Sequence, residues 1–217
     1  MIFDIVYISG EVIQFSRHSW YVMSIYFLFS VFVVLQTAMD SQEVAFAKEV
    51  ISLSDSEYGF LVSIAGAGIL IGSLINVLCA RKFTLSFIMG IGSIMVSVGY
   101  LMFAFSNHFV MASLGVFTLA FSLAFANTGF YTFYQNNIPV NVMGRVGSLY
   151  GFIEALLVII TTSVFAVIAH FISIQFTVVL GAIVMLILTC SLLLFSLSPS
   201  KTEYYQTDLV EAKEVVL

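Results

Sequence analysis

Residues 58–78, YGFLVSIAGAGILIGSLINVL, carry no charged side chain over 21 consecutive positions. An α-helix rises about 1.5 Å per residue, so a helix of this length crosses the roughly 30 Å hydrocarbon core of a bilayer. A strand of a transmembrane barrel needs only about 10 residues of alternating polarity, and this run does not alternate. The run therefore predicts a membrane-spanning helix.

Five more apolar runs of similar length accompany it, and only one of them contains a charge, Glu154. Both prolines, Pro139 and Pro199, fall outside every run, where they interrupt no helix. The sequence therefore predicts an all-α integral membrane protein with six transmembrane helices. The five further spans are residues 19–39, 83–105, 109–134, 147–169 and 171–195.

The composition supports the same class. The chain has 217 residues, of which 61% are hydrophobic and 9% charged, and its mean hydropathy is +1.10. A soluble domain carries about 25% charged residues, so lipid must be the solvent for much of this chain. A net charge of −5 argues against nucleic acid as a partner. Cys79 and Cys190 are interpreted as small apolar residues, and the sequence indicates neither a metal site nor a cofactor.

The basic residues predict the orientation. With six helices, six of the seven Lys and Arg residues fall on one side of the membrane and only Lys48 on the other. Basic residues near helix ends favour the cytoplasm, so we expect a cell-membrane protein with both termini cytoplasmic. Residues 40–57 are then expected to form the one long outer loop. The six residues on the cytoplasmic side are Arg17, Arg81, Lys82, Arg145, Lys201 and Lys213.

Two motifs resemble a known family. Residues 54–63, SDSEYGFLVS, lead into residues 66–74, GAGILIGSL, and resemble the entry to the eighth helix of a major facilitator superfamily transporter. Gly72-x-Leu74-x-Asn76 followed by Arg81-Lys82 is similar to the family's motif at the next turn. Asn76 stands where the family usually has Asp, and the central Gly of the motif is absent.

The second motif is Ile138-Pro139-x-x-x-x-Gly144-Arg145-Val146, which resembles the cytoplasmic turn between the tenth and eleventh helices. The resemblance covers about residues 19–196 and is closest to bacterial drug and macrolide exporters. It implies the C-terminal six-helix half of a twelve-helix fold, with residues 1–18 as the end of the cytoplasmic linker and 197–217 as an acidic cytoplasmic tail. Because such transporters bind substrate between their halves, it also implies a second six-helix half, from a separate chain or a second copy.

Glu154 is the leading candidate for proton coupling, because a carboxylate buried in lipid is costly and has to face protein or water. It lies seven residues, about 10 Å, from the expected start of its span at Gly147. Asn127 falls at the same depth on the preceding span, within reach of a hydrogen bond to Glu154. The alternative is a neutral Glu and an Asn that only fasten helices together.

Four more residues are candidates for lining a cavity. Gln36 and Asp40 are four apart, on one face of the first helix near the outer surface. Tyr26 and Tyr131 are suited to binding aromatic drugs. The alternatives are an ordinary helix end for the first pair and interfacial anchors for the tyrosines.

Gly72 has a packing role in one interpretation, because it pairs with Gly68 in the Gly-x-x-x-Gly spacing that lets helices approach closely. The other interpretation is that these smooth faces let helices rock during transport. Arg81, Lys82 and Arg145 either set the topology alone or, as the resemblance implies, form charge pairs that lock a transport state.

Half of a proton-coupled efflux transporter for small molecules is the leading hypothesis. Gly-x-x-x-x-Gly-Lys is absent, so ATP is not the expected energy source. An intramembrane serine protease would need Ser and His within the membrane, and no candidate His is at mid-span, so an enzyme is not expected. The remaining alternative is a membrane protein that does not transport, either a fragment or a structural protein.

Overall fold

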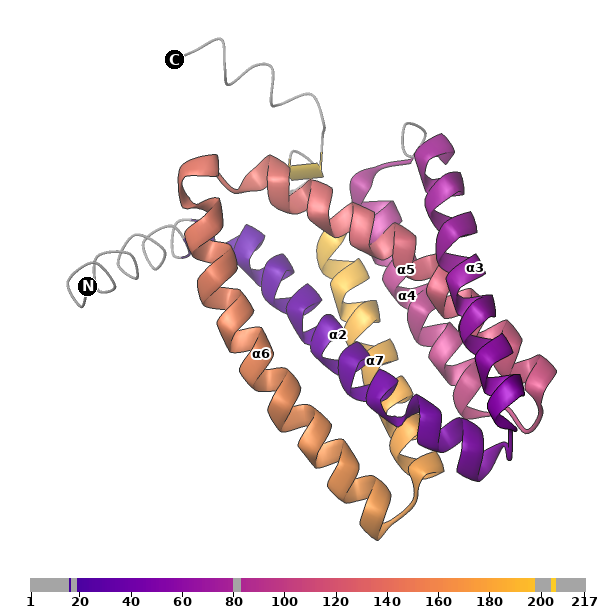
Figure 1. The fold of residues 1–217 in the computed structure, drawn as a ribbon. Helices are drawn as coiled ribbons and strands as arrows, with labels where there is room; N and C mark the ends of the chain where they lie inside the picture. The colour runs from indigo at the N-terminus through magenta and orange to yellow at the C-terminus, as the bar shows by residue number, and fades with distance from the viewer. Residues whose placement is uncertain (1–15, 17–18, 80–82, 198–203, 206–217) are drawn as a thin grey trace.

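The computed structural model describes residues 16, 19–79, 83–197 and 204–205, and all six predicted spans are helices in it (Figure 1). Each is long and apolar enough to cross a membrane. The prediction of an all-α membrane protein is therefore confirmed. The helices are α2 (Trp20–Ala45), α3 (Asp55–Cys79), α4 (Leu85–Ala104), α5 (Phe109–Asn137), α6 (Val140–Phe171) and α7 (Ile174–Ser196).

The helices run alternately up and down, so α2 begins and α7 ends on the same side of the bundle (Figure 1). We call this side the terminal end and the opposite side the far end. The turns at the far end are short and capped: His108 Nδ1 accepts a hydrogen bond from the Met111 amide at the start of α5, and Ser173 Oγ accepts one from Phe176 at the start of α7. Caps of this kind satisfy amides that have no partner within the helix.

The predicted outer loop at 40–57 is wrong over its first part, because the helix continues there. α2 extends to Ala45 and passes into a five-residue π-helix, η1 (Phe46–Val50). No Gly or Pro interrupts residues 40–50, and Phe46 and Ala47 are fully buried, so burial keeps the chain helical beyond the apolar run. The connection to α3 is short, with Ser52 at a φ of 63°, and an ion pair of 2.6 Å joins Lys48 to Asp55 across it.

The helix α6 also differs from its expected span. It begins at Val140 directly after Pro139, whereas the apolar run begins at Gly147. Pro is well suited to a helix start because it lacks the amide that would be unsatisfied there. Glu154 therefore lies about 21 Å along the helix, close to its middle, and not one or two turns from its start.

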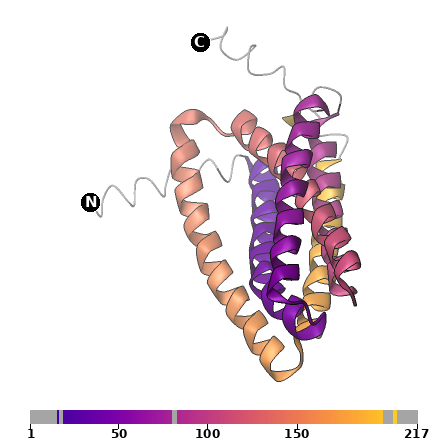
Figure 2. The same ribbon diagram turned by 45° about the vertical axis from the view of Figure 1, so that its right-hand side comes forward.

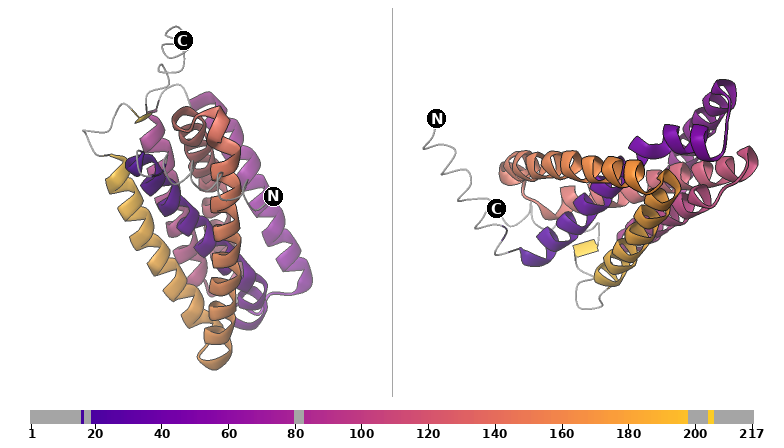
Figure 3. Two further views of the ribbon diagram at one scale, coloured as in Figure 1. Left: turned by 90° about the vertical axis from the view of Figure 1, so that its left-hand side faces the viewer. Right: turned by 90° about the horizontal axis from the view of Figure 1, so that it is seen from below.

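The helices differ strongly in how far the chain itself covers them. α5 packs against both α3 and α4, α4 also packs against α7, and α2 packs against α6 and α7. α3 and α6 lie at different edges of the bundle (Figures 2 and 3). Only 6% of the most apolar window of α6 is buried, compared with 61% in α4. α6 is thus the least covered helix of the six.

Glycines set the close approach of α4 and α5. A Cβ on Gly92 would lie 2.7 Å from the amide nitrogen of Ala126, and one on Gly129 would lie 2.7 Å from the Cα of Met89. Both distances are shorter than normal contacts, so the two backbones touch only because the side chains are absent. Lipid provides little drive for helix association, and close backbone packing of this kind replaces it.

Candidate functional site

An aromatic cluster lies where α2, α5 and α6 meet. Tyr26 of α2 is 8% exposed, and its ring centroid lies 5.5 Å from Phe130, 5.6 Å from Tyr134 and 5.2 Å from Tyr150. Phe29 extends the cluster by stacking on Phe130 at 4.0 Å. We call Tyr26, Phe130, Tyr134 and Tyr150 the aromatic cluster. Three of its four members carry a phenol, so it combines apolar surface with hydrogen-bond donors.

Glu154 lies at the edge of this cluster. It follows Tyr150 by four residues on α6, which places both on one helix face, and it is close enough to Tyr26 for an electrostatic interaction. Its side chain is half-buried and makes no hydrogen bond or ion pair to any described residue. The structure therefore brings together the predicted proton carrier and one of the predicted cavity tyrosines, Tyr26.

Local contacts hold α6 against α5 at this site. The Tyr134 hydroxyl donates a hydrogen bond of 2.7 Å to the carbonyl of Met143, near the start of α6. Gly147 leaves room for this approach, since a Cβ there would lie 3.1 Å from the Tyr134 oxygen. Ser16 Oγ and the Tyr150 hydroxyl share a hydrogen bond of 3.2 Å.

Two of the predicted site residues, Asn127 and Tyr131, make few contacts with the aromatic cluster and Glu154. Asn127 is half-buried on α5, and the described structure contains no hydrogen bond between it and Glu154. α6 packs along α2 and hardly touches α5 beyond the contacts of Tyr134, so the fold does not bring the side chains of Asn127 and Glu154 together. Tyr131 is 59% exposed and touches the cluster only at its edge, with its ring centroid 5.8 Å from Phe130.

Gln36 and Asp40 lie in a separate polar group toward the far end. The Tyr100 hydroxyl of α4 donates a hydrogen bond to Asp40, and the Gln36 side chain also approaches that carboxylate. One turn further on, Glu43 accepts a hydrogen bond of 3.4 Å from the Tyr58 hydroxyl of α3. The group ties α2 to α3 and α4, a role that the sequence of α2 alone does not reveal.

Tyr100→Phe is expected to lower the free energy of unfolding by about 1 kcal/mol, because the buried Tyr100 ring loses its bond to Asp40, a carboxylate that Gln36 and solvent still reach. Tyr131→Phe is the matched control: its hydroxyl is on an exposed ring, so the change should stay below about 0.5 kcal/mol. Thermal unfolding of the purified protein in detergent measures both. Equal stability of the two variants would contradict a structural role for the Tyr100 hydroxyl.

A pocket of about 670 Å³ opens at the far end between η1 and the α6–α7 turn. Its polar lining residues are Gln42, Glu49, His170, Ser173 and Gln175. None of the four predicted cavity residues lines it. Within the described part of the chain, no three His, Cys, Asp or Glu side chains are grouped closely enough to hold a metal ion.

The motif residues on α3 serve the α3–α5 contact. A Cβ on Gly72 would overlap the carbonyl oxygen of Phe121, so this glycine permits the packing of α3 on α5. Asn76 is 3% exposed and donates a hydrogen bond of 3.3 Å to the Ala124 carbonyl, while its Oδ1 has no partner among the described residues.

The basic motif residues are described only in part. Arg145 is half-buried in the second turn of α6. Arg81 and Lys82 lie outside the described residues. Their predicted role in charge pairs therefore stays a prediction.

Fold and composition together define an all-α, multi-pass membrane protein. The chain matches no protein-family model, no curated protein and no solved structure.

Proposed function

We propose that this chain is one half of a secondary transporter that exports small molecules in exchange for protons. The observation that carries the proposal is the position of Glu154, a carboxylate near the middle of the least covered helix, close to Tyr26 and one turn from Tyr150. Ionisable groups at such depths are expensive and commonly belong to proton or substrate pathways. The motif resemblance to major facilitator superfamily exporters supports the same class.

The proposed transporter needs a second six-helix unit against α3 and α6. Lipid cannot solvate the Glu154 carboxylate, and the described chain offers it no hydrogen-bond partner. Three glycines on these helices face open space: Gly66 on α3, and Gly144 and Gly151 on α6. No side chain projects at these positions, so the helix faces there are flat and uncovered by the chain. Such faces are suited to close helix packing with another membrane domain.

The terminal end is proposed to face the cytoplasm. Arg145 lies near that end of α6, whereas Lys48 lies at the far end and is paired with Asp55. Trp20 is 76% exposed at the start of α2, as expected of an interfacial anchor at this end. The aromatic cluster lies between the terminal end and mid-helix, so substrate would enter it from the cytoplasmic side.

The chemistry proposed for the site is competition between a proton and a substrate. The ionised Glu154 accepts hydrogen bonds from a substrate whose aromatic part packs on the cluster rings. When Glu154 binds a proton, it loses its charge and part of its acceptor capacity, so the substrate is released. One carboxylate can thus couple an inward proton to an outward substrate without ATP.

Inverted membrane vesicles test this function directly. The vesicles contain the chain with its native membrane partners, and an imposed gradient makes their lumen acidic. Adding an exported compound should release protons and dequench a luminal pH-sensitive dye, and a panel of aromatic drugs supplies the candidates. If no compound in a broad panel dissipates the gradient above that of vesicles lacking the chain, the non-transporting alternative is favoured.

A cross-linking prediction tests the second unit. After replacement of Cys79 by Ser and Cys190 by Ala, Gly151→Cys carrying a thiol-attached benzophenone is expected to form a photo-cross-linked species in native membranes, because residue 151 lies on the open face where the partner is proposed to pack. Ile187→Cys, at a position 63% exposed on α7, is the lipid-facing control. A product of twice the chain mass indicates a second copy, and any other mass indicates a separate chain. Only monomer at both positions would contradict the second unit.

A further inference from the structure

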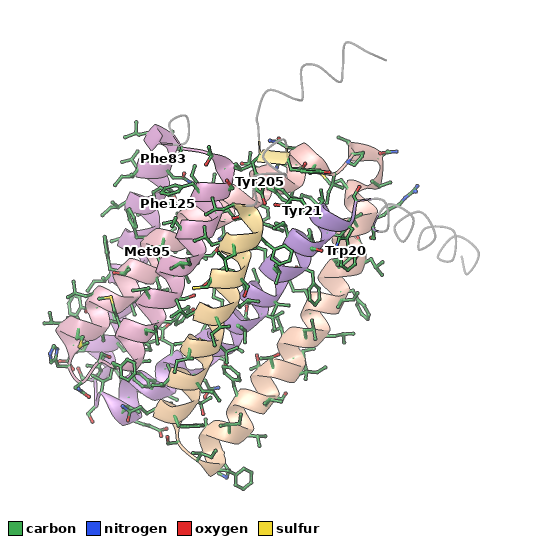
Figure 4. All side chains as sticks on the ribbon, turned by 180° about the vertical axis from the view of Figure 1, so that it is seen from behind. Trp20, Tyr21, Phe83, Met95, Phe125 and Tyr205 are labelled. Atoms are coloured by element: carbon green, nitrogen blue, oxygen red, sulfur yellow. The ribbon has the colours of Figure 1, made fainter. Side chains whose placement is uncertain are left out.

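Tyr204 and Tyr205 follow α7 in the chain and pack against the terminal end of the bundle. Tyr205 is only 5% exposed although it lies outside the membrane-spanning helices. Its ring stacks on Phe133 of α5 with centroids 5.1 Å apart and meets Tyr21 of α2 edge-on at 6.4 Å. Figure 4 shows Tyr21 and Tyr205 close together at this end. The segment is therefore docked between two helices.

A chain of hydrogen bonds fixes Tyr205 in place. The Tyr21 hydroxyl donates a bond of 2.8 Å to the carbonyl of Phe195, near the end of α7. A phenol has one proton to donate, so Tyr205 must be the donor in the 3.0 Å bond between the two hydroxyls. Burial, together with this donated bond, raises the pKa of Tyr205, so the hydroxyl stays protonated at physiological pH and the contact does not switch with pH.

Tyr204 is held from the other side by α5. The amide of Asn137, the last residue of α5, donates bonds of 2.9 Å to the carbonyls of both Tyr204 and Phe133. Carbonyls in the last turn of a helix have no partner within it, so the Tyr21 hydroxyl satisfies the carbonyl of Phe195 at the end of α7. The two tyrosines thus join the start of α2 to the ends of α5 and α7.

The same two helices, α2 and α5, carry most of the aromatic cluster. Tyr26 follows Tyr21 by five residues, and Tyr134 directly follows Phe133. Any separation of α2 from α5 at the terminal end has to break the contacts of Tyr205 first. We propose that Tyr204 and Tyr205 form a latch that closes the terminal end of the bundle and controls access from that side to the aromatic cluster and Glu154.

This inference rests on the proposed function only in treating the aromatic cluster as a substrate site. The test needs neither substrate nor a pH gradient. Val146 of α6 is fully buried next to Gly147, so Val146→Cys in the chain lacking Cys79 and Cys190 reports opening near the cluster. Membranes in which the terminal end faces the medium are treated with a water-soluble maleimide, and the rate at which it labels the cysteine at position 146 is measured.

Tyr205→Ala removes both the stacked ring and the hydroxyl, and is expected to raise the labelling rate at position 146 about tenfold. Tyr205→Phe keeps the ring on Phe133 and loses only the bond to Tyr21, so about a threefold rise is expected. Tyr204→Ala is the second variant if Tyr205→Ala does not accumulate. Asn137 donates its hydrogen bond to the backbone carbonyl of Tyr204, which an alanine keeps, so the rise in labelling rate should be smaller than for Tyr205→Ala.

Val34→Cys, a matched reporter on α2 at a position that is 4% exposed and further from the terminal end, separates a latch from general loosening. A latch leaves the labelling rate at position 34 unchanged in every variant. Equal increases at positions 34 and 146 would show that Tyr205 only stabilises the whole fold, and unchanged labelling at position 146 would show that the segment controls no access. Either result overturns the proposal, whereas a failure of transport in vesicles leaves this measurement intact.

Discussion

Glu154→Gln is expected to reduce proton release from acidified vesicles by at least about 100-fold, the scale of loss typical when a positioned proton-transfer group is removed. Glutamine has nearly the same shape and fits beside Tyr150 and Tyr26, but it cannot bind and release a proton. Substrate should still bind, because the rings of the aromatic cluster are unchanged. The rate of dye dequenching after substrate addition measures the effect.

Two controls make the Glu154 result specific. Glu154→Asp keeps the carboxylate on a shorter side chain and should retain measurable proton release. Glu57→Gln removes a carboxylate from the far end, where its side chain caps the start of α3 through the Ser54 amide, and should leave proton release unchanged. If Glu154→Gln exchanges protons as fast as the unchanged chain, then Glu154 only fastens helices and the coupling role is wrong.

The six spans follow from the sequence because burial in lipid needs a long uncharged run, and that requirement is visible without any tertiary contact. The ends of the spans are less visible. α2 runs past Asp40 because Phe46 and Ala47 find buried positions in the bundle, and α6 begins at Val140 because Pro139 favours a helix start. Both helix extensions, residues 40–45 and 140–146, include polar or charged residues, so a prediction based on hydropathy leaves them out of the spans.

The candidate site was predicted only in its separate parts. Glu154 and Tyr26 stood out as the one intramembrane charge and a tyrosine suited to binding aromatic drugs, yet nothing local in the sequence says that α2 and α6 pack together. The sequence does indicate that Tyr150 belongs to the site, since it lies four residues before Glu154 on the same helix face. It does not indicate the roles of Tyr100 and Tyr205, because their partners, Asp40 and Tyr21, are 60 and 184 residues away along the chain.

Gly129→Leu is expected to have the largest effect on stability, lowering the free energy of unfolding by about 3 kcal/mol. Its first side-chain atom would already lie 2.7 Å from the Cα, Cβ and amide nitrogen of Met89, and a backbone cannot move aside as a flexible side chain can. α4 and α5 would have to separate. Thermal unfolding in detergent and the monodispersity of the purified protein measure the loss.

Gly151→Leu is the matched control, since nothing lies within 4 Å of the position that its Cβ would take. It should change the stability of the isolated chain by less than about 0.5 kcal/mol, because it removes no contact and leucine favours a helix more than glycine does. If Gly129→Leu proved as stable as Gly151→Leu, close packing of α4 on α5 would not hold this bundle together. The expected contrast instead makes α4 and α5 the rigid part of the chain and leaves the uncovered face of α6 for a partner.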